Sequence, residues 1–455
     1  MHLLFRFLFL GLVSSVLSQE IDETALFGDA NAMLVDSATV TSPLADSSTT
    51  KPTGIKASGA LTGSAQSNFS RDFIRNPGRE DTGYPGLLFR TTGELFLDAR
   101  ASDDTKAFAA IEGRYLSDSS QANAYLRELF LDFNVRQRLY VRVGKQVLQW
   151  GRCYFWNPSD LVNVEKKSFV ERIGTLEGTS GIRLHAPFGT RANLYGFLDA
   201  ENVKTADQLK ATAKAEILLG GTETALSLWK RKDLDPVVAW DISTALHKWN
   251  IAGEAAFFPQ GFLNHYTVSA DTLVSTPNKA FTPRVALSIG RAFDFLDVSD
   301  RITVQYEMYY NGLGYDPSPL EDSREYPWKN SVSLDSARLA GLPIPYSIPN
   351  LRLDHGPKAL WLYANGQIQP YSLGRYYIAF FSSFSKFIIP DLTMSCNGLA
   401  NLTDGSYMLS GSLTYTTLQN LSLQISGVSL GGTYYGEMTY SGTRFQAQGV
   451  ATYTF

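Results

Sequence analysis

Hydrophobic and polar side chains alternate with a period of two along many segments of this chain. Between Phe89 and Ala101 the odd positions are apolar or small, with one Thr, whereas the even positions include two Arg, a Glu and an Asp. The segments from Trp249 to Phe257 and from Arg301 to Asn311 divide in the same way. Because successive side chains of a β-strand point to opposite faces, this pattern predicts an all-β protein whose strands have one apolar and one polar face.

The number and length of these segments favour a transmembrane antiparallel β-barrel over the alternative, a soluble all-β secreted protein. We count about 18 segments of roughly 9 to 12 residues, the length that a tilted strand needs to cross a bilayer. Since both ends of such a barrel lie on one side, the strand number is even, and about 16 is the alternative. The expected strands begin near Ile55, Leu87, Thr105, Ala122, Leu139, Thr179, Arg191, Gln208, Glu223, Pro236, Trp249, Thr282, Arg301, Arg375, Ile388, Tyr407, Leu421 and Arg444.

The connections between the expected strands fall into two classes of length. Tight connections are expected around residues 102–104, 135–138, 188–190, 220–222, 246–248 and 417–420. The intervening connections include long stretches at 68–86, 151–178, 258–281 and 312–374. Such asymmetry is typical of short periplasmic turns and longer extracellular loops.

Both ends of the chain agree with export to a bacterial outer membrane. The last strand alternates up to Phe455, and its aromatic end resembles the terminal signature by which the barrel-assembly machinery recognises outer-membrane barrels. Residues 1–18 combine Arg6, an apolar run and small residues up to Ser18, which predicts a signal peptide. Residues 19–54 are rich in Ser, Thr, Ala and Asp and predict a flexible periplasmic lead-in, so the barrel is expected at 55–455.

Composition narrows the class of protein further. After residue 18 no stretch approaches the roughly 18 uninterrupted apolar residues of a membrane helix. The 27 Phe, 23 Tyr and 7 Trp fit the aromatic girdles of a barrel in contact with outer-membrane lipids. With a net charge of −4 and no basic stripe, nucleic acid is not an expected partner.

Basic side chains on four consecutive expected strands form the first candidate site, which we call the basic ladder. Alternation directs them toward the lumen, except Lys145, which needs a local bulge at Gly144. The ladder consists of Arg142, Lys145, Arg183, Arg191, Lys210 and Lys214. Carboxylates from strands before and after oppose it: Glu94, Asp98, Glu112, Glu128, Asp132, Asp241, Glu254 and Glu307. Opposite charges on facing walls create a transverse field that selects among solutes, although the same charges can simply pair to fill the interior.

The segment after the expected strand at Leu139 is the second candidate site. It reads Gly-Lys-Gln-Val-Leu-Gln-Trp-Gly-Arg at 144–152, followed by Phe-Trp-Asn-Pro-Ser-Asp at 155–160. This pattern resembles porin-like outer-membrane channels of the broad group that includes alginate-export-type barrels. The resemblance implies about 18 strands, a loop that folds inward and narrows the pore, and pore-lining roles for Lys145, Gln146, Trp150 and Arg152. The alternative is that Trp150 and Trp156 anchor at the membrane interface while Arg152 caps the loop.

The longest connection, 312–374, contains eight of the 19 prolines, and a short helix is expected at 331–342. A connection of this length is expected to act as a lid or constriction, or as a surface decoration. The expected constriction residues are Trp328 of this connection and Trp150 and Trp156 of the earlier loop.

Catalysis is not expected. Of the five His only His265 and His355 fall at the outer rim, and neither is part of a recognisable catalytic pattern. No cofactor-binding or metal-binding motif is visible, and two distant cysteines, Cys153 and Cys396, give no dense disulfide framework.

The sequence therefore predicts a channel for passive or selective diffusion of small hydrophilic solutes, with a preference for anions. The alternative is a surface interaction protein whose barrel has a blocked lumen and only displays the 312–374 loop. The solute and the oligomeric state stay open at this point.

Overall fold

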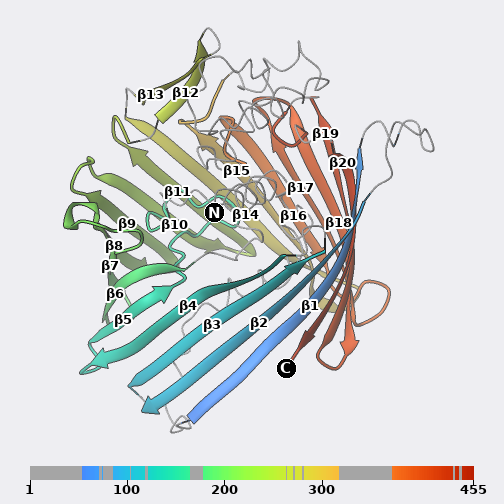
Figure 1. Cartoon of the computed structure of the whole chain (residues 1–455), viewed down its shortest axis with the longest axis horizontal. Coiled ribbons are helices and arrows are strands. Elements are labelled where there is room, and N and C mark those ends of the chain that lie inside the picture. Colours follow the sequence, from blue (N-terminus) through green and yellow to red (C-terminus); the bar gives the residue numbers. More distant parts are fainter. Residues whose placement is uncertain are drawn as a thin grey trace, which may run out of the picture.

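A computed structural model gives the structure of residues 54–70, 74, 86–102, 104–117, 121–163, 178–262, 264–269, 272–278, 281–316, 371–433, 436–439 and 443–455. Within these residues the chain forms an 18-stranded antiparallel sheet and a separate two-stranded hairpin (Figure 1). The expected signal peptide, the lead-in before residue 54, the helix at 331–342 and Trp328 lie outside the described residues.

The barrel strands follow one another in sequence around the sheet. They are β1 (Gly54–Ser70), β2 (Leu87–Ser102), β3 (Thr105–Leu116), β4 (Gln121–Val135), β5 (Leu139–Gln146), β6 (Thr179–Phe188), β7 (Ala192–Asp199), β8 (Lys210–Leu219), β9 (Thr222–Arg231), β10 (Val237–Leu246), β11 (Trp249–Phe258), β14 (Thr282–Phe295), β15 (Val298–Asn311), β16 (Tyr376–Phe384), β17 (Leu392–Asn401), β18 (Ser406–Leu418), β19 (Leu421–Gly432) and β20 (Thr443–Thr454).

The sheet closes on itself because β1 pairs with both β2 and β20. At the seam the Gly59 N–H donates to the Phe455 carbonyl at 2.9 Å, and the Phe455 N–H returns a bond at 3.0 Å. Closure leaves no strand edge unpaired, which is the requirement for a sheet in lipid. The expected fold class and the count of 18 are therefore confirmed.

The observed strands begin within four residues of the expected positions. The largest offset is at β17, which begins at Leu392 instead of Ile388, because the preceding residues form a turn closed by the Phe387 N–H and the Leu392 carbonyl at 2.7 Å. The hairpin of β12 (Asn264–Ser269) and β13 (Thr272–Pro277), at the top of Figure 1, was not expected within the 258–281 connection.

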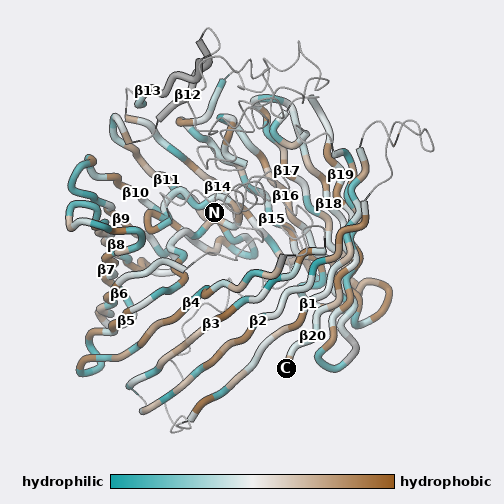
Figure 2. Tube along the Cα trace, viewed as in Figure 1, coloured by the Kyte–Doolittle hydropathy of each residue, from teal (hydrophilic) through white to brown (hydrophobic). Residues whose placement is uncertain are grey.

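The two faces of the strands have opposite character. Outward positions are apolar and exposed, for example Leu61 at 52%, Leu129 at 52% and Leu409 at 52%, and colour alternates along the strands in Figure 2. Inward positions are mostly polar and often buried, as are Gln66 on β1 and Ser410 on β18. An apolar exterior around a polar interior is typical of a barrel that faces lipid.

The long connections all lie between the expected tight ones, as the sequence predicts, although the connections at 117–120, 232–236 and 402–405 on the same side are short. Each expected tight connection joins two consecutive strands, and further short turns join β14 to β15 and β16 to β17. Gly220 begins the β8–β9 turn with φ of 65°, a left-handed conformation that glycine adopts without strain. No helix within the described ranges is long and apolar enough to cross a membrane.

Candidate functional site

Residues 147–163, which we call the inner loop, follow β5 and lie against the inner wall of the barrel. β5 has eight residues whereas its neighbour β4 has 15, so the chain leaves the sheet early. The Val147 N–H donates to Glu128 of β4 at 2.8 Å, and this bond marks the point of departure. From there the inner loop contacts side chains of strands from β8 to β16.

Two wall carboxylates accept hydrogen bonds from five consecutive main-chain N–H groups of the inner loop. Glu254 of β11 binds the N–H groups of residues 152 and 153, the latter at 2.6 Å. It also binds the Ser159 N–H at 2.9 Å and hydroxyl at 2.8 Å. Glu307 of β15 binds the N–H groups of residues 154, 155 and 156 at 2.8, 3.0 and 2.5 Å. Each carboxylate is 1% exposed, and buried charges persist where hydrogen bonds satisfy them.

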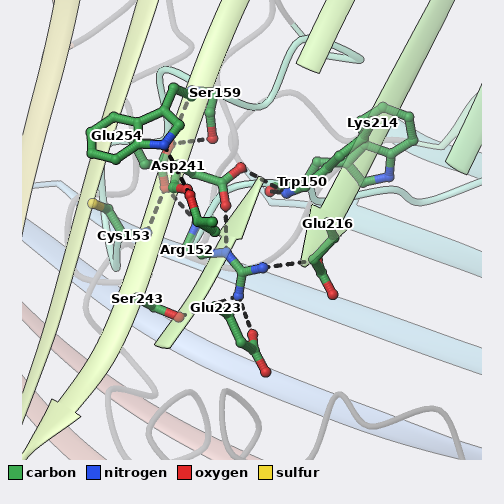
Figure 3. A network of polar contacts seen from close by, with 12 residues as sticks. Trp150, Arg152, Cys153, Ser159, Lys214, Glu216, Glu223, Asp241, Ser243 and Glu254 are labelled. Carbon is green, nitrogen blue, oxygen red and sulfur yellow. Dashed lines mark hydrogen bonds and ion pairs between the residues drawn. The ribbon is translucent and has the colours of Figure 1, made fainter. Parts of the chain in front are cut away.

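Arg152 of the inner loop joins this loop to Glu216 of β8, Glu223 of β9 and Asp241 of β10 (Figure 3). Its guanidinium binds Asp241 and Glu223, and it binds Glu216 at 2.8 Å. Burial by itself lowers the pKa of Arg152, but Asp241, with Glu216 and Glu223, outweighs it and raises the pKa above the ordinary value. Arg152 is therefore a fixed cation in the interior.

Lys214 of β8 is a second attachment point. Its ammonium donates to the Trp150 carbonyl at 2.6 Å and pairs with Asp241 at 2.9 Å. Because the Lys214 side chain is buried, with 5% exposed, its ammonium interacts with these two protein partners and not with solvent. Lys214 is a member of the basic ladder, but its side chain binds the inner loop and is not exposed to the lumen.

Aromatic packing completes the attachment. The Trp156 indole N–H donates to the Tyr371 carbonyl at 2.9 Å, and its ring stacks on Tyr309 with centroids 5.2 Å apart. Tyr154 packs edge-on against Phe381 at 4.5 Å. Further along, Leu161 is fully buried in a cluster with Trp229, Val237, Ala239, Ala256, Phe258 and Phe262. The inner loop is thus held by both charge and apolar burial.

Two further residues of the basic ladder, Arg142 and Arg183, lie on β5 and β6. Arg142 and Arg183 are register partners, and both are on the inward set of positions. Arg142 binds Asp132 through two hydrogen bonds of 2.6 and 2.8 Å. Arg183 makes no hydrogen bond and no ion pair with any residue of the described part. Of this register pair, only Arg183 lacks a carboxylate partner.

The other predicted site residues have varied surroundings. Lys210 pairs with Asp199 at 3.2 Å, and Glu94 binds Arg127 at 2.8 Å. Arg191 is exposed in the short turn before β7. Trp150 and Trp156 are buried within the inner loop.

Lys145 occupies a register position of the outward set, because it pairs with Leu129 and Ser180. The bulge expected at Gly144 is absent, since the register of β5 continues through this residue without a shift. The irregularity lies instead in β4, where Arg127 is the extra residue opposite Ala110 and Ile111. The expectation of a bulge at Gly144 was therefore wrong.

The sequence placed Asp241 and Glu254 among the lumen carboxylates but did not indicate that they bind the inner loop. Their partners are main-chain groups and an arginine about 90 to 100 positions away, contacts that have no periodic signature. Both cysteines are free thiols, with Cys153 buried in the inner loop and Cys396 exposed on the outward face. No group of three or more metal-ligating side chains occurs among the described residues.

Comparisons with known proteins find similarity in the fold alone. No protein-family model and no curated protein sequence matches this chain. Pseudomonas aeruginosa OccK2 (OpdF) is similar with a TM-score of 0.50 and 11% identity, covering 88% of this chain and 97% of its own. A BenF-like porin from Pseudomonas fluorescens Pf-5 has a TM-score of 0.49, 10% identity, and coverage of 88% and 98%. At 11% identity the similarity to OccK2 shows the barrel fold alone.

Proposed function

We propose that this chain is an outer-membrane channel through which small hydrophilic solutes diffuse passively, with a preference for anions. The observation that carries the proposal is Arg183, an inward cation without an ion-pair partner in the described part of the chain, on the wall next to a loop that folds into the barrel. The porin-like group that includes alginate-export-type barrels is the family we propose, on the inner-loop pattern at 144–160.

The apolar exterior and the closed sheet support a location in the outer membrane. The signal peptide proposed at residues 1–18 would direct export, and the barrel-assembly machinery would insert the strands. Outer-membrane lipids would then surround the outward set of side chains.

The proposed selectivity arises from unequal pairing of the interior charges. Arg152 and Lys214 are paired with three carboxylates, Glu216, Glu223 and Asp241, so neither cation is left to attract a passing anion. Arg183 instead has the like charge of Arg142 beside it, and Asp132 is already bound to Arg142. An anion near this pair therefore gains an attraction that a cation does not.

The test is solute uptake into proteoliposomes that contain the refolded chain. A sugar acid is expected to enter faster than a neutral sugar of the same size, and Arg183→Gln is expected to reduce that difference. Equal rates for both solutes in the wild type would contradict the anion preference. A barrel that folds but admits neither solute would contradict the channel and favour a blocked lumen.

A further inference from the structure

The outer surface of the barrel carries an arginine without an ion-pair partner among the described residues, at the end where the short turns lie. Arg291 is near the end of β14 and is the register partner of Trp249, the first residue of β11. It shares its alternating set with Val285 and Leu287, which are exposed on the outward face. Arg291 therefore belongs to the surface that faces lipid and not to the lumen.

Two aromatic rings hold the Arg291 guanidinium in place. Its Cζ atom lies 5.2 Å from the Trp249 ring centroid and 4.6 Å from that of Phe293. The two rings stand edge to face, 6.3 Å apart at 89°. A planar cation gains energy over each ring face, so the side chain is fixed in direction before any ligand arrives.

This guanidinium has no anion of its own. Its Nε atom is buried without a hydrogen-bond partner, and the side chain makes no hydrogen bond or ion pair within the described residues. Asp294 interacts with its charge, but one oxygen of that carboxylate binds Lys248 at 3.3 Å and the other accepts the Asp300 N–H at 3.0 Å. A buried donor without an acceptor is costly, so the surroundings are expected to supply one.

We propose that Arg291 binds the phosphate group of a glycerophospholipid headgroup in the leaflet on the side of the short turns. Aromatic girdles of a barrel lie at headgroup level, and Trp249 and Phe293 place Arg291 in such a girdle. A guanidinium offers two parallel donors to a phosphate. Within the described residues the Arg291 charge has no hydrogen-bonded or ion-paired anion, so an anionic headgroup binds better than a zwitterionic one.

The first experiment is native mass spectrometry of the refolded chain in detergent with added phosphatidylglycerol. The wild type is expected to retain lipid adducts, and Arg291→Gln is expected to retain about fivefold fewer. Arg231→Gln is the matched control, because Arg231 has the same charge but binds Asp233 at the end of β9, at the long-connection side. Adducts equal in Arg291→Gln and the wild type would overturn the proposal.

A second measurement separates the headgroup from other anions and keeps the test informative if Arg291→Gln does not fold. The fluorescence emission of Trp249 is obtained by subtracting the emission of the Trp249→Phe variant from that of the wild type. Brominated phosphatidylglycerol is expected to quench this signal more than brominated phosphatidylcholine, and Phe293→Leu, which keeps the charge, is expected to reduce the quenching. Equal quenching by both lipids, or relief of quenching by millimolar inorganic phosphate, would contradict a headgroup site.

Discussion

Two charged regions of the inner wall use their charges in different ways. On β10, β11 and β15, Asp241, Glu254 and Glu307 are at most 1% exposed, and all three are engaged by the inner loop or its attachments. On β5 and β6, Arg142 and Arg183 face each other, and only Arg142 has a carboxylate partner. The first region fixes a loop, whereas the second leaves a charge for solutes.

The difference lies in the partners and not in the residue types. In the first region, main-chain N–H groups that would be unsatisfied in a dry interior meet carboxylates that would be unpaired there. In the second region two cations meet across a strand pair, where like charges oppose each other. Variants that remove charged side chains from one region or the other test whether the two regions have distinct roles.

The largest effect is expected from removing both anchoring charges, in the variant Glu254→Gln with Glu307→Gln. Hydrogen bonds to a charged acceptor contribute about 1.5–3 kcal/mol each, so the inner loop should detach from β11 and β15. Single-channel conductance should rise and become noisy, and proteases should cleave within residues 147–163. Glu94→Gln is the matched control, because Glu94 binds Arg127 away from the inner loop. Unchanged conductance and unchanged protease resistance would contradict the anchoring role.

A smaller effect is expected from Arg152→Met, which leaves Glu216, Glu223 and Asp241 without their common cation. Removing one partner of a buried charge cluster costs about 3–5 kcal/mol, and half-exposed Glu223 should bring the loss to the lower end. Urea unfolding should show the loss. Arg231→Met serves for comparison, since its partner Asp233 is largely exposed. A matching loss in both variants would show that the cluster has no special role.

Arg183→Met and Lys214→Met should separate selectivity from attachment. A unit charge about 4 Å from a solute is worth about 1 kcal/mol in water, or about fivefold in the anion-to-cation permeability ratio. Reversal potentials in a salt gradient should therefore shift toward cations in Arg183→Met. Lys214→Met should mainly lower stability, because Lys214 binds the Trp150 carbonyl and Asp241. The reverse assignment of effects would refute the division into two regions.

The smallest effect concerns the pH dependence of Cys153 labelling. Burial, together with the charges of Glu254 and Glu307, raises the pKa of the Cys153 thiol well above its ordinary value. A raised pKa keeps the thiol protonated as pH increases through the ordinary range, so maleimide labelling of the folded barrel should not accelerate between about pH 7 and 9. Cys396→Ser isolates the signal. Rapid labelling that follows an ordinary thiol titration would show that the inner loop leaves the wall.

The sequence predicted the barrel well because strand alternation is local. Positions such as Phe89 and Leu95 need only their neighbours to indicate a lipid-facing set, and both side chains are exposed on the outward face of β2. The inward direction of Arg142 and Arg183 follows from the same alternation.

The site was predicted less well because its contacts are not local. The inner loop reverses inside the barrel, so Arg152 meets Asp241 and Glu254 across about 90 to 100 positions of sequence. Alternation cannot indicate which carboxylates accept main-chain N–H groups. Alternation also failed to indicate the position of the bulge near Lys145. The bulge that would have turned Lys145 inward occurs at Arg127 on the neighbouring strand.

The barrel is expected to conduct solutes past the inner loop. The most direct measurement is single-channel recording in a planar bilayer with the refolded chain from residue 19 onward. We expect discrete ohmic conductance steps and an anion-biased reversal potential. A β-rich, heat-modifiable barrel that stays electrically silent would contradict it.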